Sequence, residues 1–242
     1  MERGLLEAEK KHLLLALKEA SKEELQQIEA AFELENACAA IGFEGNNHIT
    51  HEEVERLIKT RRLLDRSERE QKEVLNHVRA FDFIKQAVNE KKELTEEFLK
   101  DVHQIILEDI MVGGLYRQVN IQLIGSTHQP PDHVKVYDRM KKFFMNLEEF
   151  KGDAIELACY VHLSISKIHP FVDGNGRLAR LMMNFILMKN DYLPISISRE
   201  HIQAYFKALD VFKEQKDMTP MIDLVTERLM KRYNDVNQIL NK

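Results

Sequence analysis

The sequence predicts a mainly α-helical fold, and three observations lead to that prediction. Only 9 glycines and 5 prolines occur in 242 residues, which disfavours a turn-rich β fold. Apolar residues recur every three or four positions over most of the chain, which is the helical period. Capping boxes, in which Ser, Thr or Asp is followed three residues later by Glu, occur at Ser21, Thr50, Ser67 and Asp153.

The expected helices follow these signals in order. A pattern of apolar and charged residues opens the chain, and the first three capping boxes each begin a helix. Apolar stripes mark the helices at 68–89 and 96–110. The fourth box begins another helix, which ends before Pro170 because the residue before a proline disfavours helix. Thr219 before Pro220 reads as a cap followed by proline at the first helical position. The predicted helices cover 5–20, 22–41, 51–63, 68–89, 96–110, 133–148, 154–168, 176–189, 199–212 and 220–238.

One stretch does not read as helix. Gly113-Gly114 and Pro130-Pro131 bracket a segment in which apolar and polar residues roughly alternate. Gly125, Ser126 and Thr127 supply turn residues near its middle. We therefore predict a short β-hairpin or extended flap here.

Composition limits the class of protein. The chain has 35 Lys+Arg against 40 Asp+Glu, so its net charge of −5 argues against a general nucleic-acid binder. No apolar run reaches the roughly 18–20 residues of a membrane span, and the N-terminus does not resemble a signal peptide. Two cysteines give no disulfide framework. We expect a cytoplasmic protein with an N-terminal helical region at 1–66 and a core at 67–242.

The most informative stretch runs from His169 to Arg180. Gly174, Asn175 and Gly176 precede a helix, and a glycine-rich turn that opens a helix can bind an anion through free N–H groups and the helix dipole. Arg177 and Arg180 lie on one face of the first turn of this apolar helix, so they need a counter-charge.

Two readings of these arginines remain open. A phosphate chain suits arginine through bidentate geometry. A structural ion pair with Asp173 or another acid would satisfy the same charges. In the first reading, His169 could accept a proton from an attacking hydroxyl, and Asp173 could hold Mg²⁺ together with substrate phosphates.

The stretch HPFVDGNGRLAR resembles the signature of the Fic family, H-x-F-x-[DE]-G-N-G-R-x-x-R, at every fixed position. The wider chain is similar to Fic proteins from about Ser67 onward. The resemblance implies a Fic-fold helical bundle that transfers AMP from Mg-ATP to a Ser, Thr or Tyr hydroxyl of a target protein and releases pyrophosphate.

The resemblance also implies residue roles. His169 would be the general base, and Asp173 would coordinate Mg²⁺. The anion hole would be formed by Gly174, Asn175 and Gly176, with Arg177 and Arg180 holding the outer phosphates.

More residues follow from the same resemblance. Ile121 and Ile124 of the flap are candidates for gripping the target, whose backbone would pair with the flap. Tyr205 is a candidate contact for the nucleotide base, although it reads equally well as a packing aromatic. Phe171 would anchor the loop in the core. Self-modification and a homodimer are further features of the family, whereas nucleic acid and membrane are not expected partners.

A second segment, Glu44-Gly45-Asn46, resembles the inhibitory motif [ST]-x-x-x-E-[GN] of Fic proteins that carry their brake before the core. The resemblance implies that Glu44 pairs with Arg180 and so denies that guanidinium to the γ-phosphate. Ala40 stands where the pattern has Ser or Thr, which would loosen the brake. Gly45 and Asn46 would also suit a plain helix end.

Alternatives concern the reaction itself. A Glu44 that orients a water would make the protein a de-AMPylating or bifunctional enzyme. Another nucleotide, such as GTP or UTP, could replace ATP. A non-catalytic nucleotide-binding module is the alternative from another class, but it would have lost His169 or Asp173, and both are present.

Overall fold

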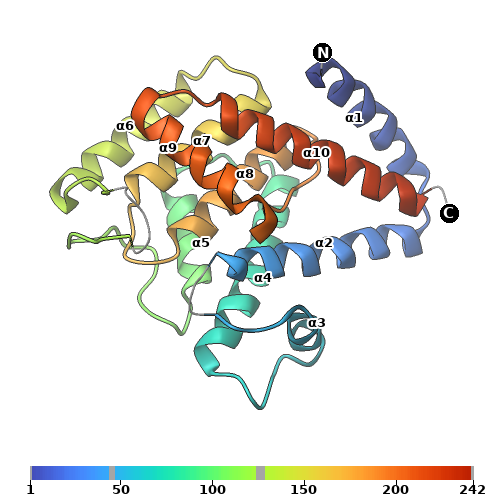
Figure 1. The fold of residues 1–242 in the computed structure, drawn as a ribbon, viewed down its shortest axis with the longest axis horizontal. Coiled ribbons are helices and arrows are strands. Elements are labelled where there is room, and N and C mark those ends of the chain that lie inside the picture. Colours follow the sequence, from blue (N-terminus) through green and yellow to red (C-terminus); the bar gives the residue numbers. More distant parts are fainter. Residues whose placement is uncertain (1, 44–46, 124–128, 241–242) are drawn as a thin grey trace.

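The computed structural model describes residues 2–43, 47–123 and 129–240, and the regular structure in these ranges is helical (Figure 1). No β-strand occurs within them. The α-helices are α1 (Glu2–Glu19), α2 (Lys22–Gly42), α3 (His51–Thr60), α4 (Glu68–Asn89), α5 (Glu96–Ile106), α6 (Val136–Glu148), α7 (Ala154–Ile168), α8 (Asn175–Lys189), α9 (Ile202–Gln215) and α10 (Thr219–Leu240). Short 3₁₀ turns, His133–Lys135 and Arg199–His201, precede α6 and α9.

Every predicted helix is confirmed, and the local signals explain most of the boundaries. All four predicted capping boxes form, with both reciprocal hydrogen bonds present at each. Two helices end three or four residues earlier than predicted. Helix α3 ends at Thr60 because Arg61 adopts a left-handed conformation with φ 62°, and α5 ends at Ile106, after which the chain continues as turns.

Helix α8 lies at the centre of the molecule and packs against α7, α4 and α5 (Figure 1). Its side chains from Leu178 to Leu187 are buried on every face, as its apolar sequence predicts. Met182 and Met183 are fully buried, so the methionine-rich sequence is core. The start of α8 therefore has neighbours on all sides, which fixes its position.

The N-terminal helices pack onto the rest of the chain. Leu6 and Leu13 of α1 and Phe32 of α2 belong to the same hydrophobic cluster as α4 to α10. Helix α1 packs on α10, and α2 packs on α4. A second apolar cluster joins the end of α2 to α3 and α4 through residues such as Ile41, Leu57 and Val74. The C-terminal end of α2 is thereby held close to α4.

The predicted β-hairpin flap is wrong for the described residues, because 115–123 and 129–132 contain no strand. In place of a partner strand, side chains form hydrogen bonds with the backbone of this segment. Arg117 donates to the carbonyls of Val119 and Pro131, at 2.9 and 2.5 Å. Asn120 accepts a hydrogen bond from the His133 N–H at 2.8 Å. The segment is thus an extended loop held by a buried arginine.

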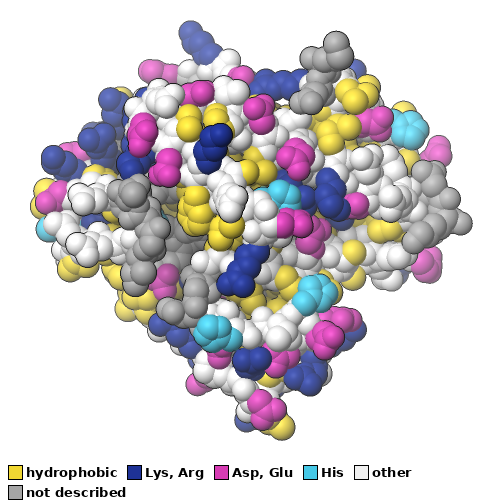
Figure 2. Space-filling model, viewed as in Figure 1, with side chains coloured by type: hydrophobic (Ala, Val, Ile, Leu, Met, Phe, Trp, Pro, Cys, Tyr) yellow, Lys and Arg dark blue, Asp and Glu magenta, His cyan; other side chains and the backbone are white. Residues whose placement is uncertain are grey.

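The visible surface carries both signs of charge without a large basic area. Figure 2 shows Lys and Arg side chains interspersed with Asp and Glu over this face, in agreement with the small net charge. Among the described helices, none has a stretch that is both long and apolar enough to cross a membrane.

Candidate active site

The loop between α7 and α8 brings most of the predicted site residues together. Pro170 stops α7, and His169 caps it in a left-handed conformation with φ 51°. Gly174 begins α8 with φ 76°, where a Cβ would also meet His103 and Ile106 at 3.4 Å. Glycine suits this position because it adopts positive φ without strain. The first N–H groups of α8 after Gly174 have no intrahelical acceptors, as at any helix N-terminus.

The Asn175 side chain stabilises the α7–α8 loop through two hydrogen bonds to the backbone of Phe171. Its side chain accepts from the Phe171 N–H at 2.9 Å and donates to the Phe171 carbonyl at 3.0 Å. Phe171 is fully buried, as predicted, and stacks on His103 with ring centroids 3.6 Å apart. The Asn175 side chain is therefore occupied in shaping the loop, and any anion contact from this residue would come from its backbone.

The contacts of His169 determine which ring nitrogen carries the hydrogen of its neutral imidazole. Its Nδ1 lies 3.2 Å from the Ser166 carbonyl, which can only accept a hydrogen bond. A neutral imidazole therefore carries its hydrogen on Nδ1 and leaves Nε2 as the basic nitrogen. The His169 carbonyl accepts from Arg117 Nε at 2.9 Å. Both contacts limit rotation of the residue, so the imidazole has a fixed orientation.

Asp173 presents two different carboxylate oxygens. Oδ1 accepts from the Gly174 N–H at 2.6 Å and lies 3.6 Å from Arg177 Nη2. Oδ2 accepts from Arg69 Nη2 at 3.1 Å. The side chain is 30% exposed. One oxygen thus belongs to the loop, and the other is directed toward α4.

The two arginines of α8 have different partners. The Arg177 side chain is fully buried and forms the ion pair with Asp173, as the structural reading of this residue predicts. Arg180 Nη2 donates to the Ala40 carbonyl at 3.0 Å, and its guanidinium lies 4.8 Å from the Phe43 ring centroid. A Cβ on Gly176 would lie 3.4 Å from Arg180 Nη1. Arg180 therefore lies over the start of α8, against the end of α2.

The remaining predicted residues lie around this centre or outside the described ranges. Tyr205 is buried, 3.1 Å from His162 Nε2 through its hydroxyl, and its ring centroid is 5.0 Å from that of Phe43. Ile121 is half-buried in the extended loop. Glu44 and Ile124 lie outside the described residues.

Three buried histidines surround the arginines. Burial, together with the positive charge of Arg180 and Arg177, lowers the pKa of His77 to about 3. Burial and Arg180 lower the pKa of His162 to about 3. Burial lowers the pKa of His103 to about 4, against the opposing effect of its hydrogen bond to the Asp173 carbonyl. These side chains are neutral at physiological pH, so the arginines gain no further positive neighbours.

These histidines predict a loss of stability at mildly acidic pH. In the unfolded chain they protonate near pH 6.5, whereas in the folded protein they resist protonation down to about pH 3 or 4. The unfolded state therefore binds more protons as the pH falls below about 6.5, and each histidine lowers the unfolding free energy by up to about 1.4 kcal/mol per pH unit. Urea unfolding between pH 7 and 4.5 measures this slope. We expect His77→Gln to flatten it and exposed His12→Gln to leave it unchanged; equal slopes in both variants would contradict the prediction.

Three residues of this centre were not predicted as site residues. His103 stacks on Phe171 and accepts from the Gly114 N–H through Nδ1 at 2.9 Å. Arg117 is buried and binds the α7–α8 loop twice, through its backbone N–H to the Pro170 carbonyl and through Nε to the His169 carbonyl. Arg69 reaches Asp173 from α4. The only sequence signal for any of them was the pair Gly113-Gly114, which packs against α5 beside His103. A Cβ on Gly113 would lie 2.7 Å from Cα of Gln104, the residue that follows His103, so this close approach requires glycine.

The fold and the site together define a helical protein in which the start of one buried helix has the geometry of an anion site. The glycine-flanked N-terminus of α8, two buried arginines, an oriented histidine and a partly exposed carboxylate lie within one loop and one helical turn. Such an arrangement suits a polyphosphate ligand beside a proton acceptor.

Comparison with known proteins agrees with this class. Residues 93–187 match the model of the Fic/DOC family, and that range includes the whole His169–Arg180 stretch. The chain is 27% identical over 241 residues to the protein adenylyltransferase Fic of Drosophila persimilis, covering 96% of this chain and 47% of that protein. It is 29% identical over 234 residues to the protein of the same name from Drosophila virilis, covering 93% and 47%.

A solved structure shares the fold. A Fic domain containing signalling protein from Bacteroides thetaiotaomicron superposes with a TM-score of 0.87 at 22% identity, covering 100% of this chain and 97% of that one. The chain spans about half the length of the curated relatives that it matches.

Proposed function

We propose that this protein transfers AMP from ATP to a hydroxyl side chain of a protein. The observation that supports the proposal most is the single constellation at the start of α8. It joins a base with a defined tautomer, a carboxylate, and a glycine-flanked helix N-terminus with two arginines. The relatives described as protein adenylyltransferases support the same reaction.

Each residue has a role in this reaction. The target hydroxyl oxygen attacks the α-phosphorus and forms a new P–O bond, while the bond from that phosphorus to the bridging oxygen breaks and pyrophosphate leaves. The hydroxyl proton passes to Nε2 of His169, which is the basic nitrogen. The first N–H groups of α8 and Arg177 stabilise phosphate charge, because preorganised donors cost no rearrangement during the reaction. Arg180 binds the outer phosphates, and Tyr205 remains a candidate for the base.

The site chemistry fits Mg²⁺ as a partner of the nucleotide. No group of three or more His, Cys, Asp or Glu side chains within the described residues could hold a metal ion alone. Mg²⁺ commonly uses one or two carboxylates plus substrate phosphates, and the half-exposed Asp173 carboxylate can supply that ligand. When bound, Mg²⁺ would neutralise phosphate charge and orient the nucleotide. Asp173 is the residue that would hold it.

We further propose that the end of α2 acts as a brake through Glu44. Ala40 and Phe43 already contact the Arg180 guanidinium, and Arg199 Nε donates to the Gly42 carbonyl at 2.9 Å. Glu44 follows Phe43 directly in the sequence. A carboxylate there would compete with a phosphate for Arg180. The Ala40 carbonyl that binds Arg180 is a backbone group, and Ala40 still lacks the Ser or Thr hydroxyl of the family pattern, so the brake is expected to be looser.

The extended loop is the proposed contact for the target protein. Its backbone is fixed to the catalytic loop by Arg117, so a bound segment would be aligned relative to His169. Ile121 and Ile124 are the proposed grips for the target side chain. Self-modification and a homodimer are part of the proposal.

The position of the transferred label tests the reaction. Purified protein and its Glu44→Gly variant would be incubated with Mg²⁺ and ATP labelled either at the α- or at the γ-phosphate, with and without cell extract. We expect this protein to transfer label only from the α-position, scored as label that is absent from matched reactions with His169→Ala. His169-dependent transfer from the γ-position would indicate phosphoryl transfer and contradict the proposal. Parallel reactions with GTP and UTP identify the preferred donor.

A further inference from the structure

Arg69 lies beside the candidate site although no part of the proposed mechanism uses it. It is on α4, 104 residues before Asp173 in the sequence, and its Nη2 donates to Asp173 Oδ2 at 3.1 Å. Its Nε donates to Glu73 Oε1, also at 3.1 Å. One guanidinium therefore joins the carboxylate of the α7–α8 loop to a carboxylate of α4.

The two carboxylate oxygens of Asp173 have different partners, and this difference determines how the contact with Arg69 can affect a bound cation. Oδ1 is engaged by the Gly174 N–H and lies near Arg177, inside the loop. Oδ2 is the oxygen that faces away from the loop, and Arg69 binds it. A cation that used Asp173 without disrupting the loop would coordinate Oδ2. Arg69 and such a cation would meet at the same oxygen.

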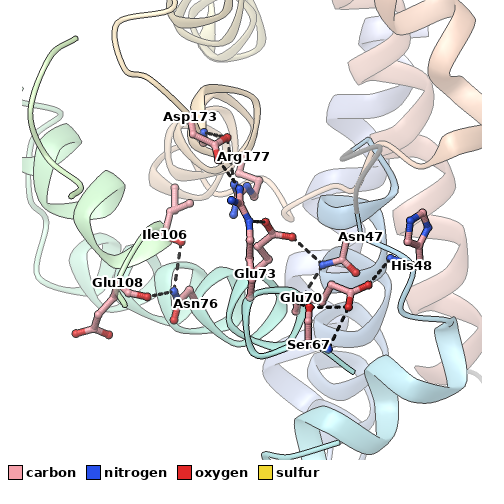
Figure 3. Close-up of polar contacts among 12 residues, drawn as sticks. Asn47, His48, Ser67, Glu70, Glu73, Asn76, Ile106, Glu108, Asp173 and Arg177 are labelled. Carbon is pink, nitrogen blue, oxygen red and sulfur yellow. Dashed lines mark hydrogen bonds and ion pairs between the residues drawn. The ribbon is translucent and has the colours of Figure 1, made fainter. Parts of the chain in front are cut away.

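Glu73 explains why Arg69 is held in place. Its side chain is only 6% exposed, so its negative charge needs partners. Arg69 supplies one, and Asn47 Nδ2 donates to Glu73 Oε2 at 2.9 Å. Figure 3 shows Glu73 between Asn47 and the Asp173–Arg177 pair. Arg69 is 60% exposed, so its outer nitrogen can leave Asp173 while Nε stays with Glu73.

We propose that Arg69 is a positioning residue that occupies Asp173 Oδ2 in the nucleotide-free protein and competes there with the divalent cation of the nucleotide. The guanidinium substitutes for the metal charge and keeps the carboxylate aligned toward α4. Binding of metal-nucleotide then requires Arg69 to release Oδ2, with Glu73 retaining it nearby. This inference depends on the proposed role of Asp173 in metal binding.

The test measures how strongly a metal and a nucleotide assist each other's binding. The probe is the non-hydrolysable β,γ-imido analogue of ATP, whose affinity is measured by calorimetry with Mn²⁺ and, separately, with EDTA. The ratio of the two affinities is the metal–nucleotide coupling. An exposed ion pair contributes little, so Arg69→Gln should raise this ratio by about two- to five-fold. Arg79→Gln is the matched control, since Arg79 lies on the same helix, is also exposed, and pairs with Glu108.

The outcomes separate the inference from the proposed function. A ratio in Arg69→Gln equal to that of wild type and Arg79→Gln would overturn the competition, even if both affinities fell together. Asp173→Asn tests the underlying assumption, because it should reduce the ratio toward one. A ratio unaffected by Asp173→Asn would refute the metal role of Asp173 itself. Loss of coupling in Asp173→Asn with no change in Arg69→Gln would refute only the role of Arg69.

Discussion

Replacement of His169 by alanine is expected to reduce AMP transfer by about 10²- to 10⁴-fold, the usual contribution of a positioned general base. The imidazole donates through Nδ1 to the Ser166 carbonyl, so Nε2 is the nitrogen able to take the hydroxyl proton. Alanine removes this acceptor. The measurement is the initial rate of label transfer from α-labelled ATP, made in the Glu44→Gly background so that the brake does not obscure the loss.

A matched control distinguishes catalysis from folding. His12→Ala, on the exposed face of α1, should retain the full rate. Thermal unfolding should show that His169→Ala remains folded, because His169 is only half-buried. Nucleotide affinity should change little, since the proposed role is in proton transfer. Label transfer at full strength in His169→Ala would exclude this histidine as the base.

Replacement of Glu44 by glycine is expected to raise transfer by about 5- to 150-fold, the range typical of coupling between two sites. The reason is competition, because a carboxylate that pairs with Arg180 removes a guanidinium needed by a phosphate. The end of α2 already contacts Arg180 through the Ala40 carbonyl and the Phe43 ring, so some inhibition can remain in the variant. The measurement is label transfer from α-labelled ATP by the wild type and the variant.

The control for this experiment is Asp65→Gly, an exposed acid in another loop, which should match the wild type. If the wild type transfers label as fast as Glu44→Gly, Glu44 is not a brake. A second readout addresses the alternative reaction. Wild-type protein that removes AMP from a labelled target, with loss of this removal in Glu44→Gly, would assign Glu44 a catalytic role.

The helices could be predicted because their signals are local. Each capping box lies within four residues, and each apolar stripe repeats within one or two turns. The errors arose where one residue changes the backbone without an obvious sequence signal. Arg61, a non-glycine residue with φ 62°, ends α3 three residues before the predicted end. Local patterns predict where a helix forms better than where it stops.

The β-hairpin form of the flap was mispredicted because its alternating apolar residues resemble a strand. In the described part, Arg117 supplies hydrogen bonds that a partner strand would have supplied. A buried arginine that binds several carbonyls has no short sequence signature. Its partners, such as Pro131 and His169, are distant in the sequence. Such contacts become visible only in the folded protein.

The candidate site shows the same difference between residues that are close in the sequence and residues that only folding brings together. His169, Asp173, Gly174, Arg177 and Arg180 are close in sequence, so their proximity followed from one loop and one helical turn. Arg69 and His103 reach the loop from α4 and α5, and no local pattern links them to it. The sequence thus predicted the residues of the α7–α8 loop and missed those that support it from other helices.

The mass that the modified protein gains shows directly which group is transferred. Glu44→Gly protein would be incubated with Mg²⁺ and α-labelled ATP, alone and with cell extract, and each species that takes up label would be examined by intact-mass and peptide mass spectrometry. We predict a mass increase equal to one AMP group on a Ser, Thr or Tyr hydroxyl, absent when His169 is also replaced by alanine. A His169-dependent increase equal to a phosphate group, or no modified protein in any reaction, would contradict AMP transfer.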